Sequence, residues 1–245
     1  MKFCTIYCRV SSNKQSNYQE GHVSLEVQES LCKTYAEKNG YFVRKVYRDV
    51  CSARDMNNQY NLKQMIRKMY KDELIRNNVK LIAKKCIECL NAGGKILLAG
   101  NGGSAADSQH IAGELVSRFE FDRPGLSAIA LTTDTSILTA IGNDYGYERL
   151  FARQIEALGS KGDVFIAYST SGSSPNIIEA LKTAKSMGIT CVGFTGLKKG
   201  AMNKLSDFLI EIPSKSTPRI QEGHLLVGHT VCGLIENEIF ASYKN

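Results

Sequence analysis

The chain has 245 residues, of which 43% are hydrophobic and 22% charged, close to the average for soluble globular proteins. This composition excludes a fibrous, collagen-like or wholly disordered protein, and no apolar run reaches the roughly 20 residues that a membrane span needs. The net charge of +7 is uneven, because residues 1–70 hold 12 lysines and arginines against 6 acidic residues. A basic first third is compatible with weak, non-specific nucleic-acid binding, although a solvated basic face is the simpler explanation.

The sequence does not begin with an apolar leader and cleavage site, so we expect a soluble, cytoplasmic protein. In that compartment the eight cysteines are expected to be reduced thiols. Cys86 and Cys89 form a CxxC pair, but they lie in a helical pattern and no second pair completes a zinc site. We therefore predict that both pack in the interior.

The first third predicts a small partial α/β segment. Residues 3–10 form an apolar run typical of a strand, and Leu25 opens a helical pattern that stops at Gly40. Residues 41–47 are aromatic and β-branched, which indicates a second strand. A polar stretch follows, and a helical pattern with a break runs from about residue 62 to 90. We divide the chain into a segment of residues 1–66 and a domain of residues 67–245.

The rest of the chain alternates between strand and helix patterns. The predicted strands are 95–99, 128–131, 164–168, 190–194 and 208–212. The predicted helices lie near 104–119, 146–158, 175–187, 199–206 and 219–242. This alternation predicts a five-stranded parallel sheet sandwiched between helices. A ligand is expected outside the carboxyl ends of the strands, where the strand order reverses.

Two loops at predicted strand ends carry the residues of an anion site. Residues 100–104 read GNGGS and residues 169–175 read STSGSSP, each just before a helix. Glycines let a ligand approach the backbone, and a helix N-terminus offers N–H groups to an anion. Neither loop is a nucleotide P-loop or a dinucleotide fingerprint. Because neither contains lysine, the pattern favours a sugar phosphate over a nucleoside triphosphate.

Two helices carry side chains suited to metal binding or proton transfer. His110 and Glu114 are four residues apart and share one helix face. Gln221 and His229 are eight residues apart on the last predicted helix, about two turns, so they can also share a face. The set could hold a divalent metal such as zinc, or it could act as an acid/base pair.

Residues from about 71 onward resemble the sugar isomerase domain family, and most closely its phosphoheptose isomerases. The resemblance rests on AGNGGSAADSQHIAGEL (99–115), TAIGNDYGYE (139–148), STSGSSPN (169–176) and TPRIQEGHLLVGH (217–229). It implies interconversion of sedoheptulose 7-phosphate and D-glycero-D-manno-heptose 7-phosphate through an enediol, the first step toward ADP- or GDP-heptose precursors. It also implies a homotetramer with one zinc per subunit.

The resemblance also implies a role for each matching residue. The catalytic pair would be Glu114 and His229. The metal ligands would be His110, Glu114, Gln221 and His229. The substrate contacts would be Asn101, Gly102, Gly103, Ser104, Glu114, Asn143, Asp144 and Gln221, with Ser169, Thr170, Ser171 and Ser174 around the phosphate.

The same family contains non-catalytic members. In these, the acidic residue of the helix after the glycine-rich loop and the histidine of the last helix are replaced. This chain has both Glu114 and His229, which favours an enzyme. The alternatives are a sugar-phosphate-binding scaffold and a DNA-associated regulator that uses the basic first third.

Residues 3–66 resemble the start of a serine site-specific recombinase, or resolvase, through IYCRVSSNKQ, SLEVQESLCKTYAEKNGY and VYRDVCSAR. Ser11 would match the nucleophile and Arg9 a catalytic arginine. Asn58 and Gln59 stand where a further arginine is expected, and phosphoryl transfer needs such charges around the scissile phosphate. We therefore expect a truncated relic without strand-cleaving activity.

Overall fold

The structure is a computed structural model that describes residues 2–10, 25–50, 60–198 and 200–243. The chain falls into two compact units, Met1–Gln64 and Met65–Asn245. Ser11, Asn58 and Gln59 lie outside the described residues. None of the helices in the described ranges is both long and apolar enough to cross a membrane.

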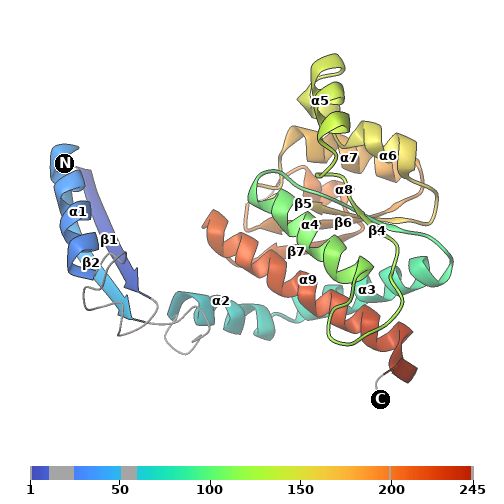
Figure 1. Cartoon of the computed structure of the whole chain (residues 1–245), viewed down its shortest axis with the longest axis horizontal. Helices are drawn as coiled ribbons and strands as arrows, with labels where there is room; N and C mark the ends of the chain where they lie inside the picture. The colour runs from blue at the N-terminus through green and yellow to red at the C-terminus, as the bar shows by residue number, and fades with distance from the viewer. Residues whose placement is uncertain (1, 11–24, 51–59, 199, 244–245) are drawn as a thin grey trace. The chain divides into compact units, whose positions relative to one another are not determined.

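The first unit is a strand–helix–strand motif, as predicted (Figure 1). Strands β1 (Lys2–Val10) and β2 (Tyr41–Val50) pair in parallel, and α1 (Leu25–Lys38) connects them. Gly40 has a φ of +69°, the left-handed conformation that ends many helices. Helix α2 (Tyr60–Lys71) follows, and Asp72 separates it from α3 (Glu73–Asn91) by accepting a hydrogen bond from the Ile75 N–H.

The second unit contains the predicted five-stranded parallel sheet, in the order β4-β3-β5-β6-β7. Its strands are β3 (Ile96–Ala99), β4 (Ala128–Ala130), β5 (Val164–Tyr168), β6 (Thr190–Gly196) and β7 (Phe208–Ile212). Every residue of β3 and β5 is buried. Strands that are buried on both faces need helices on both sides of the sheet, so the continuous apolar runs already required a three-layer fold.

Helices cover the sheet in two layers (Figure 1). One layer contains α3, α4 (Gly103–Val116) and α9 (Thr217–Ile239), with the short η3 (Ala241–Tyr243) after α9. The other contains α6 (Ala152–Leu158), α7 (Pro175–Ser186) and α8 (Met202–Leu205). Cys86 and Cys89 of α3 are buried free thiols, as expected, and burial raises the pKa of both.

One region differs from the sequence prediction. Helix α5 (Thr135–Asp144) was not predicted, although Asp134 caps it by accepting a hydrogen bond from the Ile137 N–H. The helix predicted at 146–158 is wrong in its first turns, where the structure has the 3₁₀ turn η2 (Tyr147–Arg149). Gly146 breaks the helical path with a φ of +84°, and α6 begins only at Ala152.

The sheet order reverses between β3 and β5. From β3 the chain crosses to β4 on one side and then returns to β5 on the other. The loops that follow β3 and β5 are therefore neighbours at the carboxyl edge of the sheet. This is where an open α/β sheet presents its ligand site.

Candidate active site

The loop after β3, residues 100–104, is a tight turn into α4. Gly102 has a φ of +56° and caps the helix. A Cβ on Gly100 would lie 2.5 Å from the Ser104 carbonyl oxygen, so any side chain there would open the turn. Ser104 is buried in the first turn of the helix. The turn thus directs the N-terminus of α4 at the switch point, where a helix dipole favours an anion.

The loop after β5, residues 169–174, gathers hydroxyl groups in front of α7. Ser169 Oγ lies 2.9 Å from Ser174 Oγ and 3.4 Å from Ser171 Oγ. Gly172 has a φ of +66°, which sets the reversal of the loop. Thr170 belongs to the same loop and is half-buried. The hydroxyls and the start of α7 form the kind of cradle that binds a phosphate.

The two loops are joined by a reciprocal pair of amides. Asn101 Nδ2 donates to Asn176 Oδ1 at 2.9 Å, and Asn176 Nδ2 donates back to Asn101 Oδ1 at 2.8 Å. Tyr147 of η2 adds a third bond, because its hydroxyl lies 3.0 Å from Asn101 Oδ1. Neither Asn176 nor Tyr147 was among the predicted site residues.

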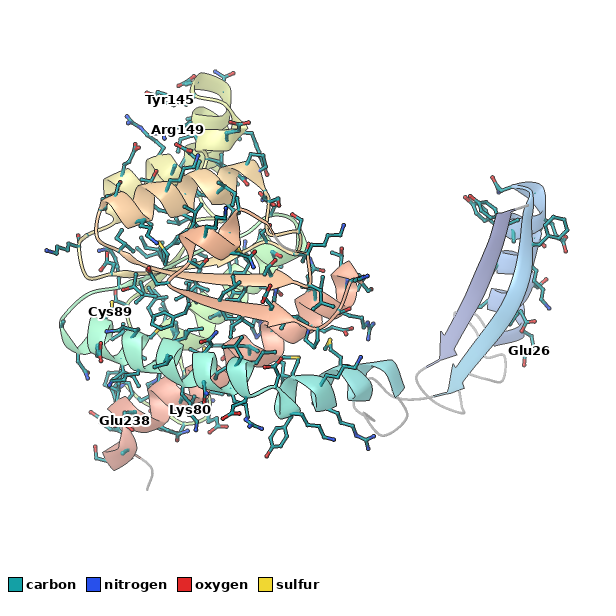
Figure 2. The ribbon with its side chains drawn as sticks, turned by 180° about the vertical axis from the view of Figure 1, so that it is seen from behind. Glu26, Lys80, Cys89, Tyr145, Arg149 and Glu238 are labelled. Carbon is teal, nitrogen blue, oxygen red and sulfur yellow. The ribbon has the colours of Figure 1, made fainter. Side chains whose placement is uncertain are left out.

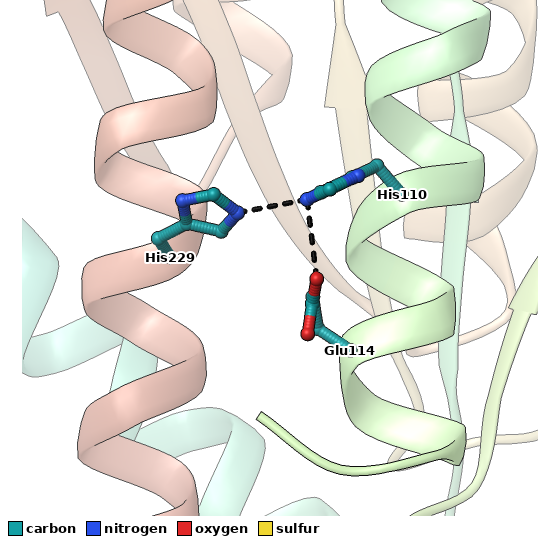
Figure 3. A group of neighbouring side chains, drawn as sticks. All are labelled: His110, Glu114 and His229. Atoms are coloured by element: carbon teal, nitrogen blue, oxygen red, sulfur yellow. Dashed lines mark hydrogen bonds and ion pairs between the residues drawn. The ribbon is translucent and has the colours of Figure 1, made fainter. Parts of the chain in front are cut away.

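His110, Glu114 and His229 converge between α4 and α9 (Figure 3). His110 Nε2 lies 2.8 Å from His229 Nε2 and 3.2 Å from Glu114 Oε1. One ligand atom from each residue lies within 4.8 Å of the other two. The helical spacing of His110 and Glu114 thus places both on the face of α4 that meets α9.

The close approach of α4 and α9 makes this convergence possible. A Cβ on Gly228 would lie 2.6 Å from Ile111 Cδ1, so a glycine is needed next to His229. Near the start of both helices, a Cβ on Gly103 would collide with the Gln221 amide. The two helices therefore run parallel, with Gln221 about 12 Å along the α9 axis from His229.

Gln221 thus lies beside the loop of residues 100–104, which we call the glycine loop. This position is compatible with the substrate contact predicted for it. Its role as a fourth metal ligand stays a prediction.

A buried ion pair holds the end of α4. Arg123 Nε donates to Glu236 Oε1 at 2.9 Å, and both side chains are almost fully buried. Arg123 also donates to the carbonyls of Glu114 and Leu115, while Glu236 accepts the N–H groups of two residues after the helix. This network fixes the turn that carries Glu114 against α9.

Burial shapes the electrostatics of the triad. It lowers the pKa of His229, and the nearby His110 lowers it further, while Glu114 works in the opposite direction. His229 therefore stays neutral, with a lone pair available, at lower pH than an ordinary histidine. Asp107 of α4 is half-buried, and burial raises its pKa to about 6; its Oδ2 is buried and has no hydrogen-bond partner among the described residues.

Asn143 and Asp144 end helix α5, and both are exposed. Asn143 Nδ2 donates to Asp144 Oδ1 at 2.8 Å. Among the described residues, no hydrogen bond or ion pair joins this pair to the loops or the triad. Their predicted contact with sugar hydroxyls stays a prediction.

Comparison with known proteins agrees with this fold. The SIS domain family model matches residues 60–196. The chain belongs to the SIS domain family and, within it, to the phosphoheptose isomerases. It is 66% identical to the phosphoheptose isomerase of Burkholderia pseudomallei over 172 residues, which cover 70% of this chain and 87% of the relative. It is 60% identical to phosphoheptose isomerase 2 of Campylobacter jejuni, over 69% of this chain and 85% of the relative.

Solved structures give the same result. The phosphoheptose isomerase of Francisella tularensis superposes with a TM-score of 0.70 at 36% identity, covering 75% of this chain and 97% of that one. The enzyme of Neisseria gonorrhoeae superposes with a TM-score of 0.67 at 41% identity, covering 73% and 96%. The model of the resolvase N-terminal domain matches residues 4–100, which extends beyond the segment predicted from the sequence and overlaps the SIS match.

Proposed function

We propose that this protein is an aldose–ketose isomerase that interconverts sedoheptulose 7-phosphate and D-glycero-D-manno-heptose 7-phosphate. The observation that carries the proposal is the convergence of Glu114 and His229 on one point beside two phosphate-type loops. The identity with phosphoheptose isomerases supports the choice of sugar. A scaffold that only binds sugar phosphates would not need this acid/base pair.

The spacing of the site suits this substrate. Its phosphate is on C7, and the reacting carbons C1 and C2 are at the opposite end. Seven residues of α4 separate Gly103 from His110, about 10 Å along the helix. A phosphate on Ser169, Ser171 and Ser174 therefore leaves a seven-carbon chain long enough to bring C1 and C2 toward the triad.

Isomerisation moves one proton between C1 and C2 and a second between their oxygens. One base takes the carbon-bound proton to give the enediol, and a partner moves the hydroxyl proton. We assign these tasks to Glu114 and His229, without ordering them. Asn101 and the hydroxyls of the loop of residues 169–174, which we call the serine loop, hold the sugar phosphate in place while the protons move.

The donor set of the triad fits a zinc ion. Two imidazoles and a carboxylate are ligands that zinc accepts, and three protein ligands leave a position open for Gln221 or for substrate. When bound, zinc would polarise the substrate carbonyl. His110, Glu114 and His229 would hold it, and His110 has no other role in our proposal.

Metal analysis tests this part of the proposal. We expect elemental analysis of protein purified without chelator to find about one zinc per chain, and His110→Ala to lower that content. Lys80→Ala, on the exposed face of α3, is the control and should leave the zinc content unchanged. Full activity in protein shown to be free of metal would remove zinc from the mechanism.

Three further properties rest on the sequence alone. We propose a homotetramer, a cytoplasmic location and no more than weak, salt-sensitive DNA binding by the basic first third. Sedimentation analysis tests the assembly, and binding to unrelated DNA duplexes at increasing salt tests the last point.

The decisive experiment is direct. Purified full-length protein is incubated with sedoheptulose 7-phosphate, and the product is resolved as the aldose. Fructose 6-phosphate serves as the competing ketose, since it carries the same phosphate ester on a shorter chain. We expect the protein to convert sedoheptulose 7-phosphate and not fructose 6-phosphate. If it does not convert sedoheptulose 7-phosphate, the proposed function is rejected.

A further inference from the structure

Tyr147 is an exposed side chain with a hydrogen bond to a site residue. The residue is 63% exposed, yet its hydroxyl is directed to Asn101 in the glycine loop, with Oη 3.0 Å from Asn101 Oδ1. It lies on η2, a segment that the sequence motif placed near the site without giving Tyr147 a role. The bond brings a third segment of the chain to the two loops at the sheet edge.

The turn that carries Tyr147 is held firmly. Leu150 and Phe151, just after it, are buried in the core on the α7 side of the sheet. Arg149, which is labelled in Figure 2, forms ion pairs with Glu156 of α6 at 2.5 Å and with Glu179 of α7 at 3.3 Å. The hydroxyl of Tyr147 is thus presented to Asn101 from a fixed support.

The side chain of Asn101 makes three hydrogen bonds within the described part of the chain. Its Oδ1 has two lone pairs, and these accept from Asn176 Nδ2 and from the Tyr147 hydroxyl. Its Nδ2 has two N–H groups, of which one donates to Asn176 Oδ1. One N–H remains without a partner among the described residues. Asn101 therefore presents a single donor, with its oxygen fully occupied.

We infer that Tyr147 is a positioning residue, which fixes the Asn101 amide so that its remaining N–H meets an oxygen of the sugar chain. This inference rests on the proposed function for the identity of the sugar. It predicts a role in holding the carbon chain and none in holding the phosphate, because the serine-loop hydroxyls do not bond Tyr147. It also connects η2 to the sugar rather than to the phosphate.

The test compares Tyr147→Phe with Tyr145→Phe. Both changes remove one hydroxyl from an exposed tyrosine of the same segment, but the Tyr145 ring packs against Arg153 at 5.1 Å, and among the described hydrogen bonds none joins Tyr145 to Asn101. We expect Tyr147→Phe to lower kcat/KM for sedoheptulose 7-phosphate about three- to tenfold, the loss typical of one neutral hydrogen bond. Inhibition by inorganic phosphate should stay within about twofold of the wild type, and Tyr145→Phe should behave as the wild type.

A double-mutant cycle separates positioning from a general structural effect. If Tyr147 acts through Asn101, Tyr147→Phe should cost nothing further in an Asn101→Ala background. The inference would be overturned if Tyr147→Phe lowered kcat/KM equally in both backgrounds. It would also be overturned if Tyr147→Phe lowered the affinity for phosphate by as much as it lowers kcat/KM, or if it left kcat/KM unchanged.

The proposed function and this inference can fail separately. If the wild type does not convert sedoheptulose 7-phosphate, the proposed function fails. The same proteins are then compared by calorimetric titration with that sugar phosphate and with inorganic phosphate. A weaker affinity of Tyr147→Phe for the sugar phosphate only would support the inference, and equal affinities would overturn it.

Discussion

Glu114 and His229 are the two residues on which the chemistry depends. We expect Glu114→Gln and His229→Ala each to lower kcat by about 10²–10⁴-fold, because each removes one partner of the proton transfer. Both side chains are partly exposed where α4 meets α9, so the variants should remain folded. The measurements are steady-state turnover and circular dichroism.

A control on the same helix guards against non-specific effects. Glu238→Gln changes an exposed carboxylate of α9 that is outside the site, and it should keep wild-type turnover. Near-full activity in either site variant would show that the assigned roles are wrong.

His224 makes folding sensitive to acid. It is fully buried, and its Nε2 donates to the Thr195 carbonyl at 3.3 Å, while its Nδ1 has no hydrogen-bond partner within the described ranges. Burial lowers its pKa to about 4 in the folded protein, from 6.5 in the unfolded chain. The unfolded state therefore binds a proton first as pH falls. The titration of His224 therefore leaves the free energy of unfolding unchanged above pH 6.5. It lowers this free energy as the pH falls further, by about 3 kcal/mol at pH 4.

His224→Phe should remove this share of the pH dependence, because a phenyl ring fits beside Tyr168 and Phe194 and does not titrate. Urea unfolding at pH 7 and pH 4 measures it in both proteins. The free energy of unfolding of the variant should change less between the two pH values, by about 3 kcal/mol. An identical pH dependence in both proteins would mean that His224 is not the group that titrates.

At the scale of elements, the contact between α4 and α9 builds the metal and acid/base cluster. Gly228→Val would force a side chain into Ile111 and push α9 away from α4. We expect a loss of about 1–3 kcal/mol in the free energy of unfolding, as for other overpacked cores. We also expect lower zinc content, because His229 would move away from His110.

Gly113→Ala is the matched control on α4. Apart from its own helix backbone, a Cβ there would have no atom of the described residues within 4 Å, so the change should stabilise the helix by about 0.5–1 kcal/mol and leave the zinc content unchanged. Chemical denaturation and elemental analysis on both variants make the comparison. Normal stability and full zinc content in Gly228→Val would show that the helices tolerate a wider spacing.

At the scale of the whole molecule, the site residues all belong to the second unit. Deleting residues 1–64 keeps Met65 and Met69, which are buried in α2, and removes the resolvase-like segment. We expect isomerase turnover within about twofold of the full chain, because the deletion removes no residue of the site. A twofold change in rate corresponds to less free energy than one hydrogen bond contributes. Loss of turnover in a truncated protein that remains folded would show that the first unit has become part of the working assembly.

The same pair of proteins tests the resolvase-like segment. We expect neither to nick supercoiled DNA, because the arginines that would support Ser11 are incomplete in the sequence. Ser11→Ala in the full chain is the control. Nicking that this substitution abolishes would contradict the view of the segment as a relic.

Local patterns in the sequence were enough to predict the architecture. Strands β3, β5 and β7 appear within one residue of their predicted bounds, because each is an apolar run between polar turns. Helix α5 was missed because its ten residues include four β-branched side chains and Gly142, which lower helix propensity, and because its cap at Asp134 is a single local signal. The i,i+4 spacing of His110 and Glu114 was sufficient to place both on one face of α4.

Contacts between distant segments were decided only by the tertiary structure. The Asn101–Asn176 pair and the Tyr147 bond join residues that are 75 and 46 positions apart, and no local pattern encodes such pairing. The sequence could place Gln221 and His229 on one helix, but only packing sets Gln221 against Gly103 and His229 against His110. By itself the sequence determined the sheet, the two loops and the residue types of the site, because these depend on periodicity and spacing along the chain. The tertiary structure decided which of them meet, because that depends on how closely two glycine-bearing helices approach each other.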